Sequence, residues 1–151
     1  MNKKFLIIFI FFISFLSTNA FAFITFKQSK VVTSDSEQIR GIQFKPDGTI
    51  MYVSERETNP DTIMQYSLST PFDISTATFQ FKTTLTNITL PHAIEFHPNG
   101  TKMYVINNTG TKVEQYTLTT AWDTSTLDHY GTYNVAKEAQ LRALAFKPDG
   151  T

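Results

Sequence analysis

The chain has 151 residues, 13 of them basic and 13 acidic, so its formal net charge at pH 7 is zero. No basic run is present that could follow a phosphate backbone, so nucleic acid is not an expected partner. Because the chain has no cysteine, it offers no disulfide, no thiolate metal site and no cysteine nucleophile, and we expect packing alone to stabilise the fold.

The first 22 residues have the pattern of a secretory signal peptide. Two lysines precede an almost entirely apolar run of twelve residues, 5–16, which is well short of the ~20 residues that span a bilayer. Ala20 and Ala22 give small side chains at the spacing of a cleavage site. We predict export with removal of residues 1–22 and a location in the periplasm, on the cell surface or outside the cell. An uncleaved anchor is the alternative, and cleavage at Ala20 or at Ala22 stays open.

Residues 23–32 form the first expected strand. Their phenylalanine, isoleucine and valine side chains suit a pleated sheet. The repeats that follow put this segment in the position of a fourth, outermost strand, so we predict a lone outer strand here.

One phrase occurs three times in the rest of the chain. F-K-P-D-G-T fills 44–49 and 146–151, and F-H-P-N-G-T fills 96–101, so the copies start 52 and 50 residues apart. In a chain rich in Thr, Tyr and Phe, that period is typical of four-stranded propeller blades, each too small to bury its own apolar faces. We therefore predict an all-β fold, a β-propeller fragment of four-stranded antiparallel blades with a repeat of 50–52 residues.

The first complete blade is expected at 39–86. Ile39, Ile42 and Phe44 predict an inner strand that is buried on both faces. The K-P-D-G sequence after it predicts a hairpin turn, because Pro sets φ, Asp caps the backbone and Gly takes the left-handed conformation. Three further strands follow, at 49–53, 63–68 and 78–85. In the second of them, period-two alternation puts three apolar side chains on one face, those of Met64, Tyr66 and Leu68.

The second complete blade is expected at 90–136, where the same elements recur. Asp73 in the first copy and Asp123 in the second are each followed by Ser and Thr, and we expect local turns from them rather than metal ligands. The neighbouring Phe72 and Trp122 are expected to fill gaps between blades.

Residues 141–151 repeat an inner strand and its turn, which predicts the start of a further blade. The predicted domain thus holds the outer strand, two complete blades and this start, over residues 23–151. We interpret it as an incomplete, truncated propeller. Its open blade faces and unpaired edges would favour self-association.

The motifs resemble a known group of repeats. F-K-P-D-G-T-I-M-Y-V, F-H-P-N-G-T-K-M-Y-V and Q-Y-S-L-S-T-P-F-D-I-S-T are similar to the YVTN and lactonase-like β-propeller repeats of secreted and surface proteins, and the resemblance covers the chain after Ala22. It implies the propeller scaffold. Members of this group include surface-layer components, non-enzymatic binding proteins and lactonases, so the resemblance leaves function open. No catalytic motif of the family can be placed on residues of this chain.

Three residues with basic side chains occupy one repeat position. Arg40, His92 and Arg142 each lie four residues before the repeated phenylalanine. At the entry to the innermost strands they would converge near one mouth of the central channel, where basic groups could hold a carboxylate or phosphate. We name them as candidate binding residues for a small anionic ligand. The alternative is that each bonds the backbone of a neighbouring blade's loop.

The other polar residues that were considered give weaker predictions of a functional site. His97 lies in a turn and His129 begins an outer strand, so surface roles are expected for both. Glu37, Asn87 and Glu138 do not share a repeat position, which disfavours a calcium site. No metal site, catalytic residue or cofactor is predicted.

These observations favour an exported scaffold that binds a ligand or a protein partner without catalysis. A fragment of a lactonase-like hydrolase is the main alternative, and a structural protein of the cell surface is another.

Overall fold

The computed structural model of the chain describes residues 29–30, 38–56, 60–107, 112–135 and 141–150. The predicted signal peptide 1–22 and nearly all of the predicted outer strand 23–32 lie outside these residues. The described part contains eight β-strands and two 3-10 helices. No helix within it is long and apolar enough to cross a membrane.

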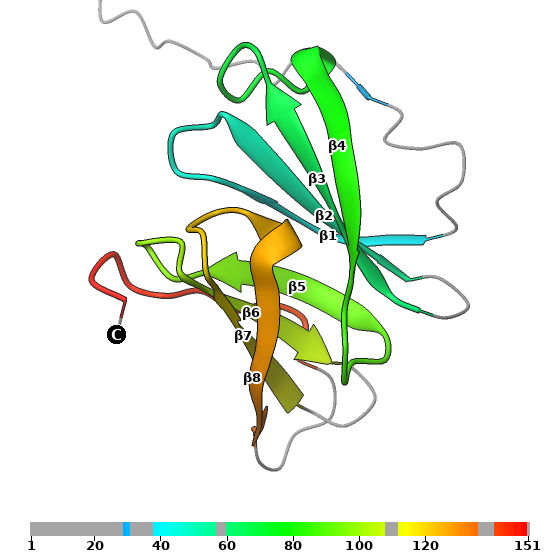
Figure 1. Cartoon of the computed structure of the whole chain (residues 1–151), viewed down its shortest axis with the longest axis vertical. Coiled ribbons are helices and arrows are strands. Elements are labelled where there is room, and N and C mark those ends of the chain that lie inside the picture. The colour runs from blue at the N-terminus through cyan, green and yellow to red at the C-terminus, as the bar shows by residue number, and fades with distance from the viewer. Residues whose placement is uncertain (1–28, 31–37, 57–59, 108–111, 136–140, 151) are drawn as a thin grey trace, which may run out of the picture.

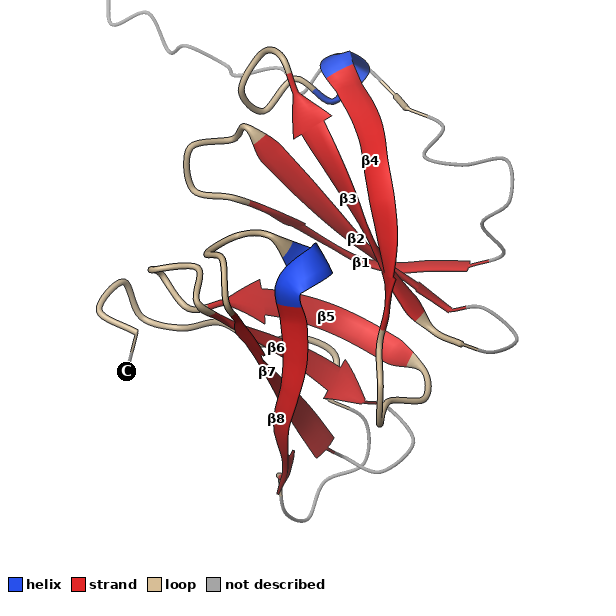
Figure 2. Ribbon diagram, viewed as in Figure 1, coloured by secondary structure: helices blue, strands red, loops and turns tan. Residues whose placement is uncertain are grey.

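The strands form two four-stranded antiparallel sheets, each with its strands in chain order (Figures 1 and 2). The first sheet contains β1 (Gln38–Phe44), β2 (Ile50–Arg56), β3 (Thr62–Leu68) and β4 (Ala77–Thr84). The second contains β5 (Pro91–Phe96), β6 (Lys102–Asn107), β7 (Lys112–Leu118) and β8 (Leu127–Asn134). A 3-10 helix precedes the last strand of each sheet, at Ile74–Thr76 and Thr124–Thr126. The prediction of repeated four-stranded antiparallel sheets is confirmed.

The predicted hairpin turn forms in the repeated phrase. Gly48 has φ +72° and donates its N–H to the Lys45 carbonyl at 2.8 Å. The Asp47 carboxylate accepts from the Thr49 amide at 3.0 Å and from its hydroxyl at 2.6 Å. The second and third copies have the same left-handed glycine, bonded to the residue three positions earlier. The phrase therefore marks the point where each inner strand reverses direction.

An aromatic ring covers each of the first two turns. A β-carbon on Gly48 would lie 2.4 Å from the Phe72 ring, and one on Gly100 would lie 2.3 Å from the Trp122 ring. Trp122 also packs on the cluster between the sheets, as predicted, and its carbonyl accepts the Tyr52 hydroxyl at 2.7 Å. Phe72 is exposed, so in this chain it covers a turn and fills no gap between sheets.

The main apolar cluster lies between the two sheets, and we call it the inter-sheet cluster. The first sheet contributes Tyr52 and Ile63, and the second contributes most of the remaining side chains, those of Ile94, Phe96, Met103, Val105, Tyr116 and Leu118. The opposite face of the first sheet carries its own buried cluster, which includes Met64, Tyr66 and Leu68. The predicted common face of these three residues is therefore confirmed.

The prediction that the first inner strand is buried on both faces is wrong for this chain. Ile39 and Ile42 of β1 are 48% and 54% exposed, whereas their repeat equivalents Pro91 and Ile94 in β5 are buried. The reason is the order of the sheets. β5 packs against β1 and β2 of the preceding sheet, while β1 is the first strand of the described chain. Burial at this repeat position therefore comes from the sheet before it.

The prediction of an inner strand at 141–147 is also not met, because this segment has no strand assignment. In both complete sheets the inner strand pairs with the strand after the turn, whereas no partner strand for 141–147 lies within the described residues. The segment nevertheless docks in the repeated manner. Phe146 lies on Tyr104 with ring centroids 4.7 Å apart, and Phe96 lies on Tyr52 at 4.4 Å.

Candidate functional site

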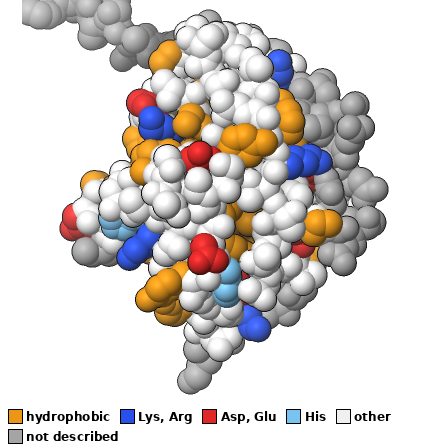
Figure 3. All heavy atoms as spheres, viewed as in Figure 1, with side chains coloured by type: hydrophobic (Ala, Val, Ile, Leu, Met, Phe, Trp, Pro, Cys, Tyr) orange, Lys and Arg blue, Asp and Glu red, His pale blue; other side chains and the backbone are white. Residues whose placement is uncertain are grey.

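The two ends of the inner strands differ in chemistry, and each is a candidate site. Arg40, His92 and Arg142 lie at the end where these segments begin, which we call the cationic end. The three repeat turns lie where they finish. On the face shown in Figure 3, basic and acidic side chains are interspersed with apolar ones, so no continuous basic surface covers that face.

At the cationic end, an imidazole lies within reach of two guanidinium charges. His92 is only 8% exposed, whereas Arg40 and Arg142 are exposed. Burial lowers the pKa of the His92 imidazole below its ordinary value, and the positive charges of Arg142 and Arg40 lower it further. His92 is therefore neutral at pH 7, and the two arginines supply the positive charge.

Main-chain contacts hold His92 in place. The Ser54 hydroxyl donates to the His92 carbonyl at 2.8 Å, and the absence of a side chain at Gly41 lets β1 approach that carbonyl closely. These contacts use the backbone of His92 and leave its ring to the cationic end. Arg40 donates to the Gln38 side chain at 2.5 Å, so its guanidinium is steadied by a residue of its own strand.

At the other end, the repeat turns enclose a cavity of about 340 Å³, which we call the turn groove. Each copy of the phrase contributes its phenylalanine and its proline, and Gln43, Glu95, Trp122 and Lys147 complete the lining. Glu95 is half-buried, and burial raises the pKa of its carboxyl. This site was not predicted from the sequence. The repeated F-x-P could have suggested it, because identical turns on adjacent sheets come together at one end.

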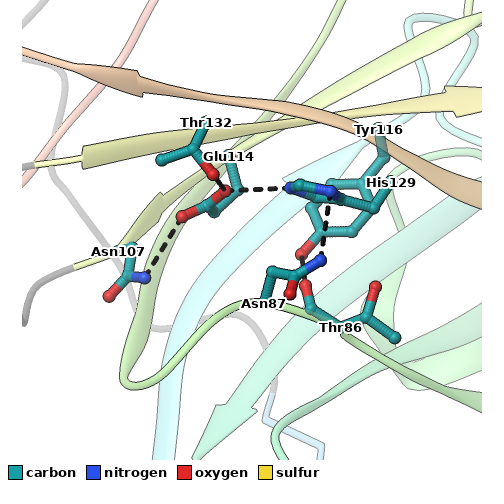
Figure 4. A network of polar contacts seen from close by, with 7 residues as sticks. All are labelled: Thr86, Asn87, Asn107, Glu114, Tyr116, His129 and Thr132. Atoms are coloured by element: carbon teal, nitrogen blue, oxygen red, sulfur yellow. Dashed lines mark hydrogen bonds and ion pairs between the residues drawn. The ribbon is translucent and has the colours of Figure 1, made fainter.

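A third group of polar side chains joins the second sheet to the linker before it (Figure 4). Glu114 is 1% exposed, and its carboxylate accepts hydrogen bonds from Asn107 and Thr132. Nε2 of His129 lies 3.0 Å from the same carboxylate, and Nδ1 lies 3.1 Å from the Asn87 amide nitrogen. The side chain of His129 is 19% exposed, so the predicted surface role is wrong. We assign this network to structure, because His129 of the outer strand connects Asn87 of the linker to the buried carboxylate of Glu114.

This network could not have been predicted by aligning the repeats of the sequence with one another. Glu114 occupies the position that Met64 has in the first sheet. Glu114 pairs with Val105 of the preceding strand, and Met64 pairs with Val53 at the corresponding place. A buried carboxylate that appears in one copy only leaves no repeated signal.

Asp73 and Asp123 make local turns, as predicted, whereas Glu37 and Glu138 lie outside the described residues. Asp73 accepts from the Ser75 amide at 3.0 Å and from its hydroxyl at 2.6 Å. Asp123 does the same with Ser125, at the same two distances. Each caps a 3-10 helix. Within the described ranges, no three His, Asp or Glu side chains gather in a way that could hold a metal ion.

A solved structure with a similar fold identifies this architecture. The chain is similar to the crystal structure of a putative 6-phosphogluconolactonase from Bacteroides fragilis, with a TM-score of 0.52 and 19% identity. The match covers 68% of this chain and 27% of that protein. The chain has the fold of β-propeller blades. No protein-family model and no curated protein matches the sequence.

In propeller terms, the two sheets are adjacent blades, and hydrogen bonds fasten one to the other. Oε1 of Gln65 in the first blade accepts from the amide and hydroxyl of Thr124 in the second, at 3.0 and 2.9 Å. The Tyr116 hydroxyl of the second blade donates to the Thr86 carbonyl of the linker at 2.7 Å. The cationic end and the turn groove lie at opposite ends of the inner strands of these blades.

Proposed function

We propose that this chain is part of an exported β-propeller scaffold that binds a small anionic ligand at the cationic end, without catalysis. The proposal is supported by the recurrence of Arg40, His92 and Arg142 at one repeat position, at the start of the inner strands, and by the charges of Arg142 and Arg40, which add to the lowering of the His92 pKa by burial. Three cationic or titratable groups from three successive repeats then share one channel mouth. Export rests on the signal-peptide pattern of residues 1–22.

The chemistry of the three side chains suits a carboxylate, sulfate or phosphate. Guanidinium groups stay charged at all physiological pH values and present planar pairs of donors to such oxygens. The His92 ring adds a donor that is neutral at pH 7. An anion bound beside it would favour the protonated imidazole and raise its lowered pKa. Anion affinity is therefore expected to rise as the pH falls.

A part of a lactonase-like hydrolase is the second candidate. The observation in its favour is the structural likeness to a protein described as a 6-phosphogluconolactonase, whose named substrate would carry a phosphate. At 19% identity this likeness supports the fold alone. The nearest hydroxyl, that of Ser54, donates to the backbone carbonyl of His92, and among the described residues no hydrogen bond joins a nucleophile to the imidazole as an activated pair would require, so binding is the better supported reading.

Sulfate is a suitable probe for the anion site, because its charge is constant between pH 5 and 8. We expect it to shift the ring resonances of His92 saturably in NMR spectra, with His97 and His129 as internal controls. Arg40→Gln or Arg142→Gln is expected to weaken binding about five-fold, since each removes one charge-assisted contact. Lys102→Gln is the matched control, because Lys102 is exposed near the turn end of the second blade.

Equal weakening by Lys102→Gln would mean that only net charge matters and would contradict a site at the cationic end. An affinity that is unchanged between pH 7.5 and 5.5 would exclude His92 from the site. Hydrolysis of 6-phosphogluconolactone faster than in buffer, abolished by His92→Gln, would favour the hydrolase reading instead.

Exposed apolar side chains on β1 support self-association as a further property. In the second blade the equivalent side chains are buried against the first blade, so β1 displays a surface that a neighbouring blade face can cover. We expect light scattering after gel filtration to give masses above the 17.2 kDa monomer. Ile42→Lys should shift the population towards monomer, while Tyr130→Lys, at an exposed aromatic of β8, should not. A monodisperse wild-type monomer would contradict this expectation.

A further inference from the structure

The turn groove has the size and lining of a small-molecule site. Its volume of about 340 Å³ falls within the ~300–1,000 Å³ that is usual for ligand pockets, which combine apolar and aromatic walls with few polar groups. The aromatic walls are Phe44, Phe96, Phe146 and Trp122. Phe96 and Trp122 lie together with ring centroids 5.3 Å apart, so the partly buried Trp122 is backed by the buried ring of Phe96 in this part of the wall.

Glu95 gives this aromatic cavity a negative charge that no ion pair among the described residues neutralises. Among the described residues, its carboxylate has neither a hydrogen-bond partner nor an ion-pair partner. Lys147 also lines the groove, but its side chain is exposed and no ion pair joins the two. Half-burial without a partner disfavours the ionised carboxylate, and the pKa of Glu95 is raised accordingly.

The fold does not require a carboxylate at this position. The same repeat position is occupied by Gln43 in the first copy and by Ala145 in the third. The first blade folds around the glutamine, with Gln43 paired to Tyr52 in the register of its sheet. Glu114 also occurs in one copy only, but its carboxylate is held by hydrogen bonds, whereas that of Glu95 has none among the described residues, which makes Glu95 a candidate binding group.

We propose that the turn groove binds a small organic amine with an apolar body, whose ammonium group pairs with Glu95 while its body packs on the aromatic rings. A cation beside a carboxylate and over aromatic faces gains from both interactions. Lys147 at the exposed side of the groove sets the specificity. Its ammonium group repels a second positive charge, so the site takes monoamines in preference to polyamines.

Trp122 makes the proposal directly testable, because it lines the groove and is the single tryptophan of the chain. We expect titration of the whole chain with 2-phenylethylamine at pH 7.5 to change tryptophan emission saturably, with a matching saturable heat in calorimetry. Glu95→Gln, which keeps the shape of the side chain, should weaken this binding about ten-fold. Asp128→Asn is the matched control, since it removes one exposed carboxylate on β8 and should leave the affinity unchanged.

Two further probes define the chemistry of the site. 3-Phenylpropionate has the same apolar body with a carboxylate in place of the amine, and it should not bind. Spermidine carries several positive charges and should bind more weakly than 2-phenylethylamine. Absence of both a saturable heat and an emission change, an unchanged affinity in Glu95→Gln, or tighter binding of 3-phenylpropionate would each overturn the proposal.

Discussion

Phe96→Ala is expected to lower the free energy of unfolding by about 3–5 kcal/mol, the usual cost of removing a fully buried aromatic side chain. Phe96 is buried in the inter-sheet cluster, where it contacts Tyr52 of the first blade and Trp122 of the second. Its removal leaves a cavity where the two blades meet, and the rings around it lose their packing partner. Chemical denaturation followed by circular dichroism measures the loss.

Phe44→Ala is the matched control, because it makes the same change at the same repeat position of the first blade. Phe44 is only partly buried and packs beside the exposed Phe72, with ring centroids 5.8 Å apart. We expect a loss of about 1–2 kcal/mol, in proportion to the smaller buried area. Equal losses for the two variants would show that the contact between blades adds nothing to the packing within each blade.

Gly41→Ala is expected to cost about 2–3 kcal/mol, at the upper end of the range for overpacked sites. An added β-carbon would lie 2.2 Å from the His92 carbonyl oxygen and 2.9 Å from the Ser54 hydroxyl. The carbonyl belongs to the backbone of β5, so it can withdraw only if the second blade moves away from the first. The same movement would stretch the 2.8 Å hydrogen bond from Ser54 to that carbonyl.

Gly131→Ala is the matched control for Gly41→Ala, because a β-carbon on Gly131 of β8 would meet no atom within 4 Å. We expect it to be neutral or slightly stabilising, since alanine loses less backbone entropy on folding than glycine. Thermal and denaturant unfolding of the two variants should therefore separate clearly. A Gly41→Ala protein as stable as wild type would mean that the blades are not in close contact along β1 and β5.

Much of the fold could be predicted because the repeated phrase carries its own local geometry. Proline, a capping Asp or Asn and a left-handed glycine make the turn after the inner strand wherever they occur, so the turn of Gly48 follows from four residues alone. Period-two alternation likewise placed Met64 and Tyr66 on one face. Burial of the inner strand could not be predicted in the same way. It depends on the preceding blade, and Ile42 differs from Ile94 in this respect although their local sequences are alike.

The candidate sites also differ in whether the repeats alone could predict them. Arg40, His92 and Arg142 could be named as candidates because they recur at one repeat position, and residues at one repeat position of adjacent blades lie at the same end of the inner strands. Glu95 and Glu114 each occur in a single copy, so the comparison of repeats passes over them. What identifies them is their surroundings, an aromatic cavity in one case and a set of hydrogen-bond donors in the other, and these surroundings exist only after the blades have packed.

The contact of a repeat phenylalanine with a tyrosine of the blade before it has a consequence for how such chains grow. The contact of Phe96 with Tyr52 and that of Phe146 with Tyr104 are equivalent, and we call each such contact between neighbouring repeats a joint. Each repeat supplies the phenylalanine of one joint and the tyrosine of the next. A row of n blades then has n − 1 joints, while a closed ring has n. Ring closure therefore adds one joint without adding a residue, which gives a cyclic arrangement more stability per repeat than any open row of the same length.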